Sequence, residues 1–202
     1  MSQAATAPRV SQEDRQRADL YNYLGLMLAR PPEAGVLAMT AGLSGDDTAL
    51  GRAVSGLAQS AASTAPEAAR AEFDRLFVGI GRGELVPYAS FYLTGFLNEK
   101  PLAKLRSDLA SLGIARAEGA SEPEDGAASL METMGALIVG RFGAPTPLHR
   151  QRDFFATHVG PWAGHFFADL EGAKGASLYA ALGAVGRRFM EIERDAFRMT
   201  VS

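Results

Sequence analysis

Cysteine does not occur anywhere in this sequence of 202 residues, and neither does a long uncharged apolar run. Without cysteine the chain cannot form disulfides, thiolate-bound iron–sulfur clusters or thiolate zinc sites, which fits a reducing compartment. No apolar stretch reaches membrane-spanning length, and residues 1–17 lack the apolar core of a secretion signal. These absences predict a cytoplasmic protein without stable insertion into a membrane.

Clustered positive charge is missing as well. The chain carries 20 Lys and Arg against 23 Asp and Glu, and it has no basic cluster with interleaved aromatic residues. Because nucleic-acid binding relies on such a surface, nucleic acid is not an expected partner. Hydrophobic residues make up 47% of the sequence, which is enough to bury one good core in a chain of this length.

Common catalytic motifs are also absent. The sequence contains no GxxxxGK[ST], HExxH or GxSxG motif and no EF-hand loop. His165 and Asp169 have helical i, i+4 spacing and could bind a metal together with His158, but a histidine that caps a helix end is favoured. A triad of Ser90, His158 and Asp125 has no support in its spacing. We therefore predict no catalytic residues and no metal site.

Apolar residues recur at helical spacing along most of the chain, and no stretch shows sustained alternation with period two. The sequence therefore predicts an all-α fold, a compact bundle of roughly eight or nine helices. Residues 1–10 are expected to form a disordered tail. Residues 11–202 are expected to form a single domain, with two lobes joined by a hinge at about residues 114–126.

Several helix ends carry recognisable signals in the sequence. The expected N-terminal capping residues are Ser11 with Asp14, Thr64 with Glu67, and Asn98. Gly143 is expected to end the helix that begins at Ala127.

A glycine-rich turn followed by aromatic residues lies within residues 72–92. Phe73, Leu76 and Phe77 form a helical stripe that ends at Gly79. Such a turn is costly to order unless the backbone needs special dihedral angles or approaches a ligand closely. The backbone amides of Gly79 and Gly81 could cradle a phosphate, whereas a helix C-cap and tight turn explain Gly79 without any ligand.

Three segments of the sequence, in this order, match the pattern of a known family. The first contains Phe73, Leu76, Phe77, Gly79, Gly81, Pro87, Tyr88, Ser90 and Tyr92; the second contains Glu122, Pro123, Glu124 and Asp125, followed by Glu132 and Met134; the third contains Phe155, His158, Pro161 and Trp162. On an all-helical background, the sequence resembles the redox-enzyme maturation chaperones of the TorD/DmsD/NarJ type. It departs from them at Gly126, where the family has a histidine.

The resemblance implies binding rather than catalysis. Such chaperones hold the twin-arginine signal peptide, or the body, of a molybdenum-containing oxidoreductase precursor in the cytoplasm until its cofactor is inserted and before export. The residues implied for signal-peptide binding are Tyr88, Ser90, Phe91, Tyr92, Glu122, Glu124, Asp125, His158 and Trp162. Tyr88, Phe91 and Tyr92 are expected to line an apolar groove. Glu124 and Asp125 are expected to face the arginines of the peptide.

Other expectations concern ligands and assembly. No cofactor is predicted beyond weak binding of a guanine nucleotide at Gly79, Gly81 and Asp125. The alternative function is a nucleotide- or metal-dependent hydrolase that uses the Gly79–Gly83 turn and His158. The chain is expected to be a monomer or a homodimer, and exchange of lobes across the hinge is one route to the dimer. No residue selects among the possible client oxidoreductases.

Overall fold

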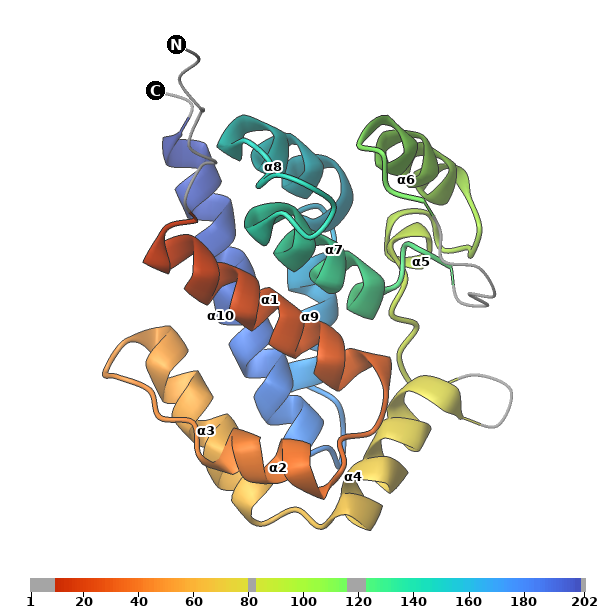
Figure 1. The fold of residues 1–202 in the computed structure, drawn as a ribbon. Coiled ribbons are helices and arrows are strands. Elements are labelled where there is room, and N and C mark those ends of the chain that lie inside the picture. The colour runs from red at the N-terminus through yellow and green to blue at the C-terminus, as the bar shows by residue number, and fades with distance from the viewer. Residues whose placement is uncertain (1–9, 80–82, 116–122, 201–202) are drawn as a thin grey trace.

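A computed structural model describes residues 10–79, 83–115 and 123–200, and all regular secondary structure in these ranges is helical (Figure 1). The α-helices are α1 (Gln12–Ala29), α2 (Ala34–Ala41), α3 (Ala49–Ala62), α4 (Pro66–Phe73), α5 (Ala89–Thr94), α6 (Lys100–Ser111), α7 (Ala127–Val139), α8 (Leu148–Phe154), α9 (Ala163–Glu171) and α10 (Leu178–Met199). Two π-helical turns, η1 (Asp74–Val78) and η2 (Phe155–Val159), extend α4 and α8. The predicted all-α class is confirmed.

The long helix α10 runs beside α1 through the middle of the molecule (Figure 1). Helix α1 packs on α7, and α10 packs on α9, α3 and α4. Helices from before and after residues 114–126 therefore share one hydrophobic core. Helices α5 and α6 lie at the end of the bundle that is opposite α2 and α3 (Figure 1).

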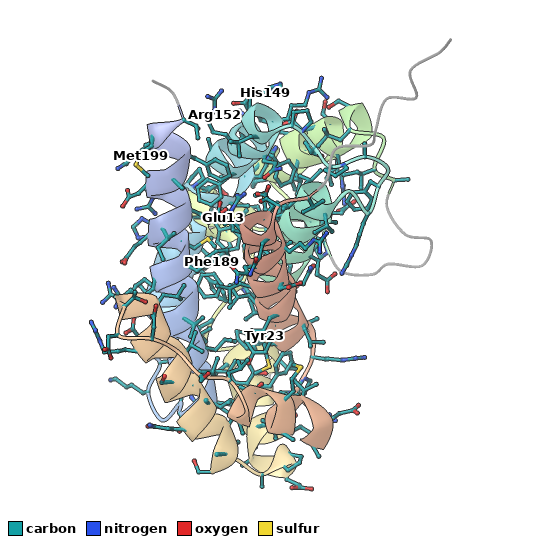
Figure 2. All side chains as sticks on the ribbon, turned by 60° about the vertical axis from the view of Figure 1, so that its left-hand side comes forward. Glu13, Tyr23, His149, Arg152, Phe189 and Met199 are labelled. Atoms are coloured by element: carbon teal, nitrogen blue, oxygen red, sulfur yellow. The ribbon has the colours of Figure 1, made fainter. Side chains whose placement is uncertain are left out.

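Large aromatic side chains and close helix contacts fill this core. The rings of Tyr21 on α1 and Phe189 on α10 meet edge to face with their centroids 4.7 Å apart, and Figure 2 shows Phe189 on the side of α10 that faces α1. A Cβ atom at Gly186 of α10 would collide with the ring of Phe167, so α9 and α10 pack more closely than a larger residue would permit. The buried carboxylate of Glu193 accepts hydrogen bonds from Arg17 and from Tyr21.

The N-terminal ends of two helices test the predicted caps. Ser11 is the N-cap of α1, and its side chain accepts a hydrogen bond from the backbone amide of Asp14 at 3.0 Å, as predicted. The prediction for α4 was wrong. Its N-cap is Ala65, followed by Pro66, whose fixed φ suits the first helical position without a side-chain cap. The Thr64 hydroxyl instead donates to the carbonyl of Ser60 in the preceding helix.

Two other predicted boundaries also need correction. Asn98 does not cap α6; it takes a positive φ of 59°, and Glu99 is the N-cap. Helix α7 ends at Gly140, not Gly143, because Gly140 adopts the left-handed conformation that favours glycine and its amide closes the helix on the Ala136 carbonyl.

Two predictions about chain organisation fall on residues that the structure does not describe. Residues 1–9 of the predicted tail lie outside the described ranges, as do residues 116–122 of the predicted hinge. The tail, the hinge and the lobe exchange therefore stay predictions. Among the described residues, no helix is both long and apolar enough to cross a membrane.

Candidate functional site

The glycine turn reverses the chain so that it returns over η1. Gly79 ends η1 with a φ of 61°, and its amide donates to the Asp74 carbonyl at 2.7 Å, so the predicted C-cap is confirmed. After the turn, Leu85 donates to the Leu76 carbonyl at 2.8 Å. A Cβ atom at Gly83 would lie 2.5 Å from the Phe77 backbone, so this close return requires glycine. Gly81 lies outside the described residues, and phosphate binding at this turn stays a prediction.

Backbone pairing then joins the first and second of the three segments that match the family pattern. Tyr88 and Gly126 form an isolated antiparallel bridge. The Ala127 amide donates to the Pro87 carbonyl at 2.8 Å, and the Ala89 amide donates to the Asp125 carbonyl at 2.9 Å. Helices α5 and α7 therefore begin side by side, although they are separated by α6 in the sequence.

The side chain of Asp125 reinforces this junction. It is only 1% exposed, and its Oδ2 accepts a hydrogen bond from the Ser90 amide at 2.8 Å. A carboxylate at this position satisfies a free amide in the first turn of α5 and interacts favourably with the helix dipole. Asp125 Oδ1 and the Ser90 hydroxyl are buried and have no hydrogen-bond partner among the described residues.

Two adjoining cavities open on either side of Tyr88, with volumes of about 380 Å³ and about 440 Å³. We call the two together the groove. Phe77, Val78, Pro87 and Tyr88 line both cavities. The first cavity extends to the end of α1 and the first turns of α7, and the second extends to the loop after α5. The remaining residues that matter below are Leu28 and Glu132 in the first cavity and Phe91, Phe96 and Leu97 in the second.

Apolar side chains of the groove are exposed to solvent. Val78 is 57% exposed, Phe96 69% and Leu97 47%. Single exposed apolar residues are ordinary, but several along one groove are typical of a binding site for an apolar partner.

Of the other predicted acidic residues, Glu124 lies beside Arg106. Arg106 donates to Glu124 Oε2 through Nε at 3.1 Å and through Nη2 at 2.9 Å. The Glu124 side chain is 13% exposed. Glu122 lies outside the described residues.

Tyr92 faces the core rather than the groove. Its ring lies 5.4 Å from the Trp162 ring and 6.0 Å from the Phe166 ring, and its hydroxyl donates to Asp169 at 2.8 Å. Burial and this hydrogen bond raise the pKa of Tyr92 above its ordinary value.

Three residues of the third segment of the family pattern, Phe155, His158 and Trp162, are buried, whereas Pro161 is exposed. Trp162 is 1% exposed, and its Nε1 donates to the His158 carbonyl at 2.8 Å. His158 Nε2 lies 2.7 Å from Asp108 Oδ2 and ties η2 to α6. Burial lowers the pKa of His158, while Asp108 opposes that shift.

The structure thus separates the predicted residues into two groups. Tyr88 and Phe91 line the groove. The others that the structure describes line neither of its cavities: Ser90, Tyr92, Glu124, Asp125, His158 and Trp162. Peptide contact by any of them stays a prediction. His165 and Asp169 are exposed on α9, and within the described ranges no three His or acidic side chains are close enough to hold a metal ion.

Several groove residues were not predicted as part of a site. They are Leu28, Phe77, Val78, Phe96, Leu97 and Glu132. One signal was present in the sequence, since Phe96 and Leu97 stand between Gly95 and Asn98, where two large apolar residues are unusual for a turn.

Comparison with known proteins gives concordant matches. The family described as "Nitrate reductase delta subunit" matches residues 44–168. A "Chaperone protein TorD" from Vibrio cholerae serotype O1 (strain El Tor Inaba N16961) is 25% identical over 202 residues, covering 90% of this chain and 91% of that protein. A "Chaperone protein TorD" from Aliivibrio fischeri (strain ES114) is 38% identical over 71 residues, covering 34% of this chain and 33% of that protein.

One solved structure has the same fold. A crystal structure from Archaeoglobus fulgidus, described as that of a redox enzyme maturation protein, aligns with a TM-score of 0.56 and 19% identity. The alignment covers 95% of this chain and 99% of that one, so the likeness extends over the whole helical bundle.

Proposed function

Since this chain belongs to the nitrate reductase delta subunit family of TorD-like redox-enzyme maturation chaperones, we propose that it binds the precursor of a molybdenum-containing oxidoreductase. The family is one of chaperones and not of enzymes. The proposed contact is the precursor's twin-arginine signal peptide, held in the cytoplasm until the cofactor has been inserted.

The groove beside Tyr88 is the observation that carries this proposal. A signal peptide contains an apolar segment, and burial of such a segment is favourable by about 25 cal/mol for each Å² of apolar surface removed from water. The exposed side chains of Val78, Phe96 and Leu97 supply a matching apolar surface. Cavities of about 380 Å³ and about 440 Å³ have room for several side chains of a bound segment.

The walls of the groove are held by backbone contacts, which favours binding with little reorganisation. The bridge between Tyr88 and Gly126 fixes one wall to the start of α7. The hydrogen bond from Leu85 to Leu76 fixes the returning chain to η1. Pre-ordered walls reduce the entropy lost on binding, so most of the apolar burial contributes to affinity.

A charge placed inside the groove tests the proposal. Val78 lies in the part shared by both cavities and is 57% exposed, so Val78→Asp should fold normally. An aspartate there would have to be desolvated beneath the peptide. Because an added carboxylate could also attract arginine, the peptide used carries an apolar segment and citrulline, the neutral isostere, in place of both arginines. We expect its affinity to fall at least about tenfold, measured by isothermal titration calorimetry.

Ile192→Asp is the matched control. Ile192 is also β-branched and 47% exposed, but it lies on α10 and outside the groove. Its variant should bind the peptide within about twofold of the wild type. Equal affinities for Val78→Asp and the wild type, or no binding of the peptide to the wild type, would contradict the proposed function.

A further inference from the structure

Three acidic residues, Glu124, Asp125 and Glu132, belong to the stretch of chain between Pro123 and Glu132, whose two ends line the first cavity, and their surroundings differ. Asp125 is 1% exposed and accepts the Ser90 amide. Glu124 is paired with Arg106 through two nitrogen atoms of the guanidinium group. Glu132 is exposed and lines the cavity. Asp125 is therefore covered and Glu124 is already neutralised, whereas the carboxylate of Glu132 is accessible to a bound cation.

Glu132 is placed so that its carboxylate can contact a ligand in the first cavity. It lies on the face of α7 that carries Ala128, one turn earlier, and both residues line the first cavity. Its Cγ atom would lie 2.7 Å from a Cβ atom at Gly25, so its stem rests across the glycine of α1. Packing of the stem restricts the side chain before any ligand arrives, which lowers the entropy lost on pairing.

Glu132 also makes no ion pair or hydrogen bond with any residue that the structure describes. Apolar side chains of Leu28, Phe77 and Tyr88 line the same cavity. This combination suits a segment with a cationic residue next to apolar ones. The guanidinium group of arginine fits best, because its planar donors can pair with both carboxylate oxygens at once.

Asp125 has a structural role instead. Its Oδ2 orders the Ser90 amide in the first turn of α5, and the same segment carries Tyr88 into the groove. Asp125 lines neither cavity of the groove but a separate cavity of about 40 Å³, so this carboxylate does not meet a segment bound in the groove. Its effect on binding is then indirect, through the position of Tyr88.

We infer that Glu132 pairs with an arginine of the bound segment, and that Asp125 is a positioning residue that does not touch it. The inference rests on the proposed function. It names the specificity-determining charge of the groove.

The test compares two peptides that differ only in charge. One carries two arginines and an apolar segment, and the other carries citrulline, the neutral isostere, in place of both arginines. We expect Glu132→Gln to weaken binding of the arginine peptide about three- to tenfold. Binding of the citrulline peptide should stay within about twofold of the wild type, and the salt dependence for the arginine peptide should decrease.

Glu13→Gln is the matched control for the loss of one negative charge. Glu13 is exposed in the first turn of α1, whereas Leu28, which lines the groove, is in the last turn of that helix. Its variant should bind both peptides as the wild type does. A drop equal to that of Glu132→Gln would mean that net charge alone is responsible, and would overturn the inference.

Two substitutions of Asp125 separate positioning from charge recognition. Asp125→Asn keeps an acceptor for the Ser90 amide, so binding of the arginine peptide should stay within about twofold of the wild type. Asp125→Ala removes the acceptor and should weaken both peptides equally. If Asp125→Asn instead weakened only the arginine peptide, Asp125 would be the charged contact and the inference would be wrong.

The outcomes also distinguish this inference from the proposed function. If Glu132→Gln bound both peptides as the wild type does while Val78→Asp still lost the citrulline peptide, the inference would fail and the proposed function would stand. If Val78→Asp bound both peptides normally, the proposed function would fail and the inference with it.

Discussion

At the α1–α10 interface the buried carboxylate of Glu193 accepts hydrogen bonds from Arg17 and Tyr21, whereas the buried Asp125 Oδ2 accepts the Ser90 amide and Oδ1 has no partner among the described residues. Apolar side chains follow the same division. Phe189 is covered at the interface, and Val78 is exposed in the groove. Satisfied polar groups and covered apolar surface stabilise the fold, while incompletely satisfied groups and exposed apolar surface leave free energy available for binding. The interface therefore serves stability, and the groove has the surface expected of the proposed binding site.

The largest expected effect is the loss of the buried carboxylate of Glu193 at the interface. Glu193→Ala leaves Arg17 without its principal partner, and the free energy of unfolding should fall by about 3 kcal/mol. Urea denaturation measures this loss. Glu191→Ala, which removes a surface partner of Arg188, should cost less than about 1 kcal/mol. Similar losses for the two variants would contradict the role given to the interface.

Two glycines give the next largest contrast. Gly186→Ala places a methyl group against the buried ring of Phe167, and overpacking should cost about 1–3 kcal/mol even though alanine favours the helix. Gly126→Ala places its methyl group 3.4 Å from the Tyr88 ring, an ordinary contact, and should change stability by less than about 0.5 kcal/mol. Thermal unfolding of both variants shows whether Gly186→Ala loses more stability than Gly126→Ala. A greater loss at Gly126 would mean that the groove wall is as tightly packed as the core.

Two tyrosine hydroxyls compare a buried acceptor at the interface with an exposed acceptor on α9. Tyr21→Phe removes a donor to the buried carboxylate of Glu193 and should cost about 1.5 kcal/mol. Tyr92→Phe removes a donor to Asp169 at the surface and should cost less than about 0.5 kcal/mol. Denaturant titration of each variant against the wild type gives both values. The comparison would break if Tyr92→Phe proved the more damaging change.

The smallest expected effect is the pH dependence that His158 gives to the free energy of unfolding. Burial lowers the pKa of His158, so the unfolded chain takes up this proton at a higher pH than the folded chain does. The contribution of neutral His158 to stability is therefore complete above an unfolded pKa of about 6.5, and it is lost as the pH falls below that value. Between about pH 7.5 and about pH 5.5, the wild type should lose more stability than His158→Gln. Equal losses, measured by urea denaturation at each pH, would contradict this.

Much of the helical framework could be predicted because its signals are local. Apolar spacing indicated most of the helices, Ser11 capped α1 as predicted, and Gly79 ended the segment before the turn. The caps that failed did so for local reasons as well, since Pro66 needs no side-chain cap and Gly140 reaches the left-handed conformation before Gly143.

The assignment of acidic residues could not be predicted, because it depends on pairing between distant segments. Asp125 and Glu132 are both acidic residues near the same junction, and the sequence does not reveal which one is covered. The Ser90 amide, 35 residues away, donates a hydrogen bond to Asp125, while Glu132 remains exposed on α7. The same applies to Trp162, whose burial depends on Tyr92 and Phe166.

Hydrogen exchange of the full chain, with and without the arginine peptide, tests the division between interface and groove most directly. Amides in η1, around Tyr88 and in the first turns of α7 should exchange more slowly when the peptide is bound. Amides of α2 and α3, at the opposite end of the bundle, should not change (Figure 1). Protection confined to α2 and α3, or no protection anywhere at saturating peptide, would contradict the claim that the groove is the binding site.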